Sequence, residues 1–153
     1  MAKFNSMMAI VSDFLARGVP ISGLGFQMHI RIDIPNEVIA ETLKQAAATG
    51  LQIHLSEVDI IFNTHNDTRG GGIENYKRLT AEMKQAQRQK YKELVQMYRD
   101  IVPPAQQYGI TFWGFNDRDT WIRRFFKMND WPCLYDDDLQ PKPAFYGFLE
   151  ALG

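Results

Sequence analysis

The sequence predicts an α/β fold in which about three parallel strands are covered by helices. Segments with strand-like apolar alternation begin near Gly23, Leu51 and Gly109, and amphipathic helical segments separate them. The connections are short at one end of these strands and long and polar at the other. Alternating strands and helices are typical of a parallel sheet with right-handed crossovers. We therefore expect the polar residues that follow the strands to meet at one edge of a single sheet.

A helix is expected over residues 2–17, where apolar residues recur at helical spacing until a glycine and a proline end it. These apolar residues are Met7, Met8, Val11, Phe14 and Leu15. The first strand follows, from near Gly23 to near His29. A second helix opens at Pro35 and is capped by Gly50, so the central strand follows after almost no loop.

The central strand is expected from Leu51 to Ile61, with the sequence LQIHLSEVDII. Period-two alternation places an apolar floor on one face of this strand and ends it in two acids. The residues that share this face are Leu51, Ile53, Leu55, Glu57 and Asp59. Parallel α/β sheets place their chemistry at the carboxyl ends of strands, which favours a catalytic role for Glu57. His54 alternates to the other face, toward the covering helices, and is expected to be structural.

Beyond the central strand, residues 63–72 form a polar, glycine-rich loop that is expected to be mobile and to leave His65 in solvent. One or two helices are expected between residues 74 and 108, broken by two consecutive prolines. The third strand begins at Gly109 in the segment GITFWGF. A loop rich in charged and aromatic residues then leads to a final short helix that ends at Leu152.

Polar or aromatic residues follow each of the three strands. They are Gln27 and His29, then Glu57 and Asp59, then Trp113, Asn116 and Asp117. Because the carboxyl ends of parallel strands lie at one edge of a sheet, these side chains are expected to line one mouth. Other conspicuous residues have simpler interpretations as packing residues or as a solvated turn. These are Phe125, Phe126 and Trp131 for packing beneath the last loop, and Asp136 to Asp138 for the turn.

Composition and charge exclude several classes of function. The chain has 153 residues, enough for one domain, and 45% of them are apolar, which excludes disorder. Seventeen basic and eighteen acidic residues give a net charge of −1 without a basic stripe, so no nucleic-acid partner is expected. No apolar run reaches the length of a membrane span, and the first residues lack the pattern of a signal peptide. The single cysteine, Cys133, cannot form an internal disulfide.

Four segments carry a resemblance to a known family: GLGFQMH, LSEVDI, TFWGFNDRDTW and LYDDDLQPKPAF. In this order and spacing, from about Asn5 to the end, the chain resembles the carboxyl-terminal half of family 10 glycoside hydrolases, the endo-1,4-β-xylanases. The resemblance implies a partial eight-stranded (β/α) TIM barrel, with these motifs on the sixth, seventh and eighth strands. Residues 1–153 would then be the carboxyl-terminal part of a catalytic barrel.

The resemblance also implies an activity and a set of site residues. The activity is hydrolysis of internal β-1,4-xylosidic bonds in xylan with retention of configuration, without a metal or organic cofactor, in a secreted or cell-surface protein. Glu57 would be the nucleophile, and His29 and Asp59 would form the hydrogen-bonded chain that holds and ionises it. The substrate-binding residues would be Gln27, Trp113, Trp121 and Asn116.

The chemistry of these residue types agrees with those roles. Retaining hydrolysis requires a nucleophilic carboxylate and a second carboxylic acid about 5–5.5 Å away. Asp59 lies about 6.6–6.8 Å from Glu57 by strand rise, so we interpret Asp59 as the partner of His29 rather than as the acid. A tryptophan offers its flat face to a sugar ring. A metal site made by these three residues lacks compact ligand spacing and is not expected.

The family's general acid/base stands in an Asn-Glu pair at the end of a fourth strand, and no strand of this chain ends in such a pair. The one Asn-Glu pair, Asn36-Glu37, follows Pro35 at the start of a helix. Three strands cannot close an eight-stranded barrel, because closure links strand number, tilt and shear. We therefore expect two kinds of partner: xylan or xylo-oligosaccharide, and either the missing barrel half or a self-associated copy.

Two other functions stay open at this point. A non-catalytic carbohydrate-binding half-barrel would depend on Trp113 and Trp121 but not on Glu57. A small doubly wound domain that binds a phosphate ligand is the weaker alternative, because no glycine-rich turn directly follows a strand. The sequence does not specify which side groups on xylan would be accepted.

Overall fold

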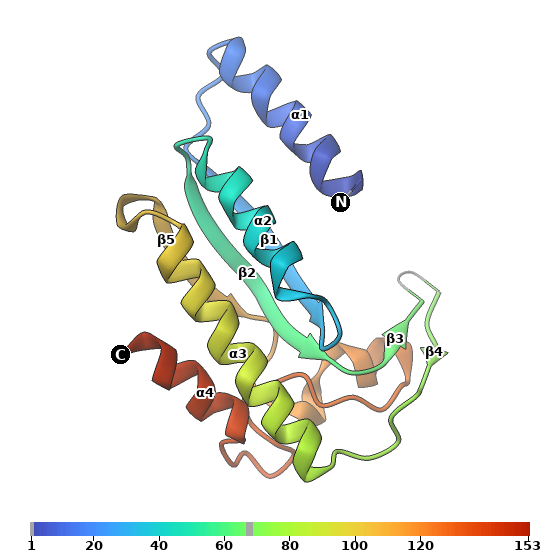
Figure 1. Cartoon of the computed structure of the whole chain (residues 1–153). Coiled ribbons are helices and arrows are strands. Elements are labelled where there is room, and N and C mark those ends of the chain that lie inside the picture. Colours follow the sequence, from blue (N-terminus) through green and yellow to red (C-terminus); the bar gives the residue numbers. More distant parts are fainter. Residues whose placement is uncertain (1, 67–68) are drawn as a thin grey trace.

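The computed structural model describes residues 2–66 and 69–153 and has the predicted α/β architecture (Figure 1). The helices are α1 (Ala2–Ala16), α2 (Asn36–Ala47), α3 (Ala81–Ile101) and α4 (Pro143–Leu152), and the strands are β1 (Gly23–Arg31), β2 (Gln52–Ile61), β3 (Thr64–His65), β4 (Gly72–Ile73) and β5 (Gln107–Phe112). Short 3-10 turns cover Pro104–Gln106 and Asp117–Asp119, and a π-helical turn covers Ile122–Phe126. The long strands form one parallel sheet in the order β1-β2-β5, which confirms the predicted fold class.

One face of the sheet is covered by α2 and α3, and α4 lies beside α3 (Figure 1). The core between the sheet and the helices contains Ile53 and Leu55 of β2, Leu43 of α2 and Leu94 of α3. Tyr98 of α3 donates a hydrogen bond across this interface, from its Oη to Ile53 O at 2.7 Å. None of the helices described is long and apolar enough to span a membrane.

Only one helix occupies the stretch between residues 74 and 108. It begins at Ala81, because the side chain of Thr80 accepts a hydrogen bond from Met83 N and thereby caps the first turn. Residues 74–80 are not helical. The two prolines end α3, as the sequence predicts, and Pro104 opens a short 3-10 turn before β5.

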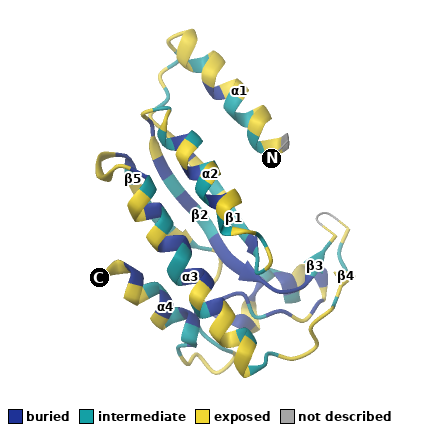
Figure 2. Cartoon of the chain, viewed as in Figure 1, coloured by how far each residue is buried: buried dark blue, intermediate teal, exposed yellow. Residues whose placement is uncertain are grey.

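The edge of the sheet beside α1 is incompletely covered. β1 and β5 each pair with β2 on one side only. α1 stands apart from the sheet, and Val11 is its one buried residue among those described (Figures 1 and 2). A cavity of about 1450 Å³ separates α1 from β1 and α2. Its lining includes apolar residues such as Phe4, Phe26 and Ile39, and it also reaches the side chains of Gln27, His29 and Trp121. The sheet therefore has a free strand edge next to a cavity of mixed polarity.

A bulge in β2 overturns the prediction that five alternate residues share one face. Gln27 of β1 pairs with Ser56, but His29 pairs with Asp59, so β2 contains one extra residue between these pairs. Glu57 lies in this bulge with φ 55. Leu51, Ile53 and Leu55 face the helices before the bulge, whereas Val58 and Ile60 do so after it. Glu57 and Asp59 consequently lie on the opposite face from the earlier apolar residues.

The same alternation corrects the position predicted for His54. This residue alternates with Ile53 and Leu55, which pack on the helices, so it lies on the open face of the sheet rather than under the helices. Its Nε2 atom is 3.1 Å from Thr111 Oγ1, and its ring lies 5.1 Å from that of Tyr108. His54 still has a structural environment, but its partners belong to β5.

The polar loop after β2 is more ordered than the sequence suggests. β3 and β4 pair antiparallel within it, and the ring of His65 stacks on Phe126 with centroids 4.3 Å apart. His65 is therefore only partly exposed, and its ring packs on Phe126 instead of standing free in solvent as predicted. The loop's predicted mobility also concerns residues 67–68, which lie outside the described residues.

Candidate active site

The carboxyl ends of β1 and β2 bring four predicted site residues together. β1 supplies Gln27 and His29, and β2 supplies Glu57 and Asp59 from the bulge onward. The loop after β5 adds Trp121, whose indole reaches the same group. These side chains come from segments up to about ninety residues apart along the chain, and the parallel register of the strands explains why they meet.

His29 joins the two carboxylates of β2. Its Nδ1 atom lies 3.0 Å from Asp59 Oδ1, and its Nε2 atom lies 3.1 Å from Glu57 Oε2. Burial lowers the pKa of His29, but the hydrogen bonds and negative charges of Asp59 and Glu57 outweigh it, so the pKa is raised above 6.5. The two carboxylates therefore stabilise the protonated imidazole, in which both nitrogens donate, relative to a free histidine.

Glu57 is held by side chains of the neighbouring strand. Gln27 Nε2 donates to its Oε1 atom at 2.9 Å, and His29 contacts its other oxygen. Its side chain keeps 24% of its accessible surface, so it is partly open to solvent. A positive φ is uncommon for a residue with a Cβ and costs about 1–3 kcal/mol. The strained backbone and the two donors give this carboxylate a fixed direction on the open face of the sheet.

Asp59 is fully buried and has no free oxygen. Its Oδ1 contacts His29, and its Oδ2 accepts a hydrogen bond from Trp121 Nε1 at 2.7 Å. Burial raises the pKa of Asp59, while the bonds from His29 and Trp121 and the charge of His65 oppose that rise. Asp59 thus orients the histidine and balances its charge, and it cannot reach a second ligand without losing a partner.

Two tryptophans flank the histidine. The Trp121 ring centroid lies 4.6 Å from that of His29, and Trp113 approaches it edge-on at 6.2 Å. Trp121 is engaged by Asp59 and by the neighbouring rings of His65 and Phe126. Trp113 keeps 43% of its surface exposed, so part of its ring is available to a flat apolar ligand surface near His29.

Asn116 has a different environment from the cluster. It is buried and caps the 3-10 turn of residues 117–119: its Oδ1 accepts from Asp119 N at 3.0 Å, and its Nδ2 donates to the Asp119 carboxylate. The structure does not bring it to the four strand-end residues, and its predicted contact with substrate stays a prediction. Asp117, which also follows the third strand, is buried against Lys142.

The residues interpreted as packing residues divide into two groups. Phe126 is buried with Ile61 and Ile122, whereas Phe125 is exposed. Trp131 packs beneath the guanidinium of Arg123. The acidic run forms an ordered turn in which Asp136 Oδ1 accepts hydrogen bonds from Asp138 N and Gln140 N.

Sequence reasoning missed three residues around the cluster. The ring of His65 contacts that of Trp121 edge-on, and Asp130 and Lys142 make buried polar contacts nearby. Lys142 could be noticed in the sequence, because it lies between two prolines at the start of a helix. Asp130 has no such local signal, because Phe62 and Asn63, whose backbone amides it binds, lie far away in the sequence. Within residues 2–66 and 69–153 no group of three His, Cys, Asp or Glu side chains has the arrangement of a metal site.

Comparisons with known proteins place these features in one family. The model of glycosyl hydrolase family 10 matches residues 1–151. Endo-1,4-beta-xylanase A of Cellvibrio japonicus is 37% identical over 159 residues, a match that covers 99% of this chain and 26% of that protein. A thermostable mutant of the xylanase Xyn10A from the same organism has a TM-score of 0.86 and 37% identity, covering 99% of this chain and 46% of that one.

A third match carries a ligand in its description. A mutant of Xylanase10C from Cellvibrio japonicus in complex with xylopentaose has a TM-score of 0.87 and 34% identity, and covers 99% of this chain and 31% of that one. The chain thus spans less than half the length of these relatives. Its three parallel strands and covering helices form part of the TIM barrel of these enzymes, and the chain belongs to glycosyl hydrolase family 10.

Proposed function

We propose that this chain supplies the nucleophile half of the active site of a retaining endo-1,4-β-xylanase. Residues 1–153 would be the carboxyl-terminal part of the catalytic barrel, with β1, β2 and β5 as its sixth, seventh and eighth strands. The protein would act on xylan outside the cell or at its surface. The observation that carries the proposal is the bridge that His29 makes between Glu57 and Asp59 at the strand ends.

In the proposed reaction, a carboxylate oxygen of Glu57 forms a bond to the anomeric carbon while the bond to the leaving sugar oxygen breaks. That oxygen takes the electron pair and a proton from a general acid, and water later displaces Glu57 in the second step. Gln27 and His29 hold the attacking group, and the exposed face of Trp113 supports the sugar ring. A fixed direction of attack lowers the entropic part of the barrier.

The general acid must come from elsewhere. Asp59 has both oxygens occupied, and no other carboxyl group of the described residues joins the cluster. A general acid typically contributes about 10²–10⁴-fold to rate, so the chain alone would turn over natural xylan slowly or not at all. The free edge of β1 and the cavity beside α1 favour the missing barrel half as the partner, since two copies would provide six strands rather than eight.

A non-catalytic carbohydrate-binding half-barrel is the second candidate. It is favoured because both oxygens of Asp59 are occupied and no other carboxyl group of the described residues lies in the cluster to act as the acid beside Glu57. In this case Trp113 and Trp121 would contribute to binding, and replacing Glu57 would have no effect on function.

One experiment separates the two candidates without the missing acid. A β-xylobioside with a dinitrophenyl leaving group and fluorine at C2 needs no proton donor, because dinitrophenolate departs unaided, and the fluorine slows hydrolysis of the ester. We expect mass spectrometry to find one xylobiosyl group on the peptide that contains Glu57. Glu57→Gln should abolish the label, and Glu41→Gln, an exposed change on α2, should not.

The outcome is informative in each direction. A protein that stays unlabelled but shows NMR shifts of the tryptophan indoles with xylotriose would support the binding candidate. Absence of both label and binding, in a chain whose NMR spectrum shows it to be folded, would contradict both candidates.

A further inference from the structure

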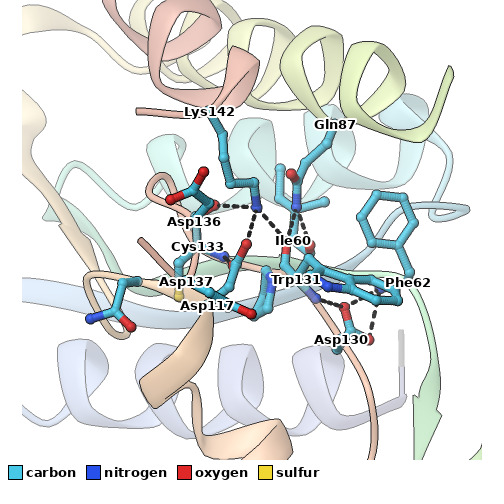
Figure 3. Close-up of polar contacts among 12 residues, drawn as sticks. Ile60, Phe62, Gln87, Asp117, Asp130, Trp131, Cys133, Asp136, Asp137 and Lys142 are labelled. Atoms are coloured by element: carbon cyan, nitrogen blue, oxygen red, sulfur yellow. Dashed lines mark hydrogen bonds and ion pairs between the residues drawn. The ribbon is translucent and has the colours of Figure 1, made fainter. Parts of the chain in front are cut away.

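The loop that carries Trp121 is pinned at both ends by buried carboxylates. We call residues 117–130 the Trp121 loop. It begins at Asp117 and ends at Asp130, and both aspartates are almost completely inaccessible to solvent. Figure 3 shows these two residues with Ile60 and Phe62 from the end of β2, and with Gln87 of α3 and Lys142 at the start of α4 reaching toward the same region. Trp121 lies between the two pins.

Asp130 ties the end of the loop to the end of β2. Its Oδ2 atom accepts a hydrogen bond from Asn63 N at 2.8 Å, Phe62 N lies within 3.0 Å and 3.1 Å of its two oxygens, and its Oδ1 accepts from Trp131 N at 2.8 Å. Among the residues described, no cationic side chain pairs with this carboxylate. Every partner is a backbone N–H, so its negative charge stabilises a particular course of the chain rather than another side chain.

Asp117 holds the beginning of the loop through α4. Lys142 Nζ donates to Asp117 Oδ2 at 2.8 Å, and the side chains of both residues are 1–2% accessible. Lys142 also donates to the carbonyl oxygens of Trp131 and Cys133, both at 2.7 Å, and Asp117 Oδ1 accepts from Cys133 N. The ion pair therefore joins the start of the loop to the segment that directly follows its end (Figure 3).

Between Asp117 and Asp130 the loop is also attached to the chain that follows β2: Phe126 O accepts a hydrogen bond from Gly71 N at 2.9 Å, and Asn129 O accepts one from Asn63 Nδ2 at 2.7 Å. Ile122 and Phe126 of the π-helical turn pack on Ile61, and the Trp121 indole donates to Asp59. Phe62 and Asn63, which Asp130 holds, follow Asp59 on the same stretch of chain. Asp130 thereby fixes the loop against the same strand end that carries Asp59, which sets where the indole N–H can point.

We propose that Asp130 is a positioning residue, which aims the indole of Trp121 at Asp59 by fixing the end of the Trp121 loop to Phe62 and Asn63. The effect of Asp130 on catalysis rests on the proposed function, in which Asp59 acts through His29. Its effect on the position of the Trp121 indole does not depend on that function. If Asp130 loses its hydrogen bonds to Phe62 N and Asn63 N, the hydrogen bond from the Trp121 indole to Asp59 should open more often. Helix α2, which lies on the far side of the sheet, should keep its structure.

The test uses Asp130→Asn in the full chain without sugar. Asparagine keeps the shape, but its NH₂ group faces a backbone N–H where an oxygen stood, so one buried donor loses its partner. Exchange of the Trp121 indole N–H with solvent, followed by NMR and assigned with Trp121→Phe, should accelerate about tenfold or more, the order expected when a buried donor is left unpaired. Amides of α2 should exchange as in the unaltered chain. Asp138→Asn, an exposed neutralisation in the turn before α4, is the matched control and should change neither.

A second measurement needs no variant, in case Asp130→Asn does not fold. In the unaltered chain, the amides of Phe62 and Asn63 and the indole of Trp121 should exchange through one opening, with the same dependence on denaturant. Indole exchange that is independent of these amides, or unchanged in a folded Asp130→Asn protein, would overturn the proposal. Failure of sugar labelling at Glu57 would contradict the proposed function alone, because these readings need no sugar.

Discussion

The imidazole of His29 holds Glu57 from the neighbouring strand, with Nε2 3.1 Å from Oε2. Glu57 can meet it only because the bulge turns this side chain to the face on which His29 stands. The other ring nitrogen is occupied by Asp59, so the histidine has one orientation and each of its two nitrogens faces a carboxylate. This geometry has consequences that can be measured on the chain alone.

The pKa of His29 should lie above 6.5 and fall when Asp59 is neutralised. Burial lowers this pKa, but the hydrogen bonds and charges of Asp59 and Glu57 raise it more. Asp59→Asn removes one of these charges, so the histidine should lose its proton at a lower pH. NMR titration of the His29 ring protons measures both values, and an equal or higher pKa in Asp59→Asn would contradict the assignment.

The fold should be more stable at pH 5 than at pH 7. Burial raises the pKa of Asp117 and of Asp130 from 3.8 to about 6. A carboxyl group whose pKa is raised by folding favours the folded state while protonated, so its contribution is lost as pH rises from about 4 through about 6. His29 acts in the same direction, since its pKa is also raised and its contribution is present below 6.5. Urea unfolding should show a gain on the order of 1–3 kcal/mol at pH 5.

A flat or opposite dependence between these two pH values would refute the pH prediction. Acids whose pKa is lowered by exposed partners, such as Asp33 and Glu93, change their contribution below this window. Asp130→Asn should reduce the difference between pH 5 and pH 7, which identifies one of the groups responsible.

Lys142→Met should lower the free energy of unfolding by about 3–5 kcal/mol, because it leaves the Asp117 carboxylate buried without its counter-charge. It also removes the donor to the carbonyls of Trp131 and Cys133. Lys92→Met is the control: Lys92 pairs with Glu150 at the surface, and such pairs contribute about 0–1 kcal/mol. Equal effects of the two changes in chemical unfolding would argue against a structural role for the buried pair.

Gly147→Ala should separate α3 from α4. An added Cβ at this position would lie 2.3 Å from Arg88 O, and backbone atoms cannot yield without moving a helix. Overpacking of this kind costs about 1–3 kcal/mol. Gly25→Ala has open space at the same atom and should be much less destabilising. Thermal unfolding of the two variants compares them directly, and a neutral Gly147→Ala would show that the helices do not pack this closely.

Trp113→Ala should weaken binding of xylo-oligosaccharide about two- to twelvefold, by removing an exposed ring surface worth about 0.5–1.5 kcal/mol near His29. Stability should change little because the ring is 43% exposed. Tyr146→Ala removes a similarly exposed ring from α4 and should leave binding unaltered. Titration of each variant with xylotriose provides the comparison, and unchanged binding in Trp113→Ala would remove this residue from the proposed sugar site.

Much of the architecture was predictable because its signals are local. The period-two segments around residues 23 and 51 and the helical spacing between them depend on neighbours along the chain, and they predict strands and helices in the right order. The sequence pattern predicts too early a start for α3, since polar residues 74–80 are compatible with a helix and only the cap at Thr80 decides where it begins.

The site was predictable as a set of residues, not as an arrangement. Chain order and strand polarity bring Gln27, His29, Glu57 and Asp59 to one edge of a parallel sheet, so the amino-acid sequence is enough to identify the side chains that end the strands. The face that these side chains occupy depends on the folded chain, since one extra residue in β2 inverts the alternation and the identity of Glu57 does not predict a positive φ. Likewise, Asp130 can hold the end of the Trp121 loop only because the folded chain brings the backbone amides of Phe62 and Asn63 to its carboxylate. A buried charge is stable only where such donors surround it, and their positions depend on the fold of the whole chain.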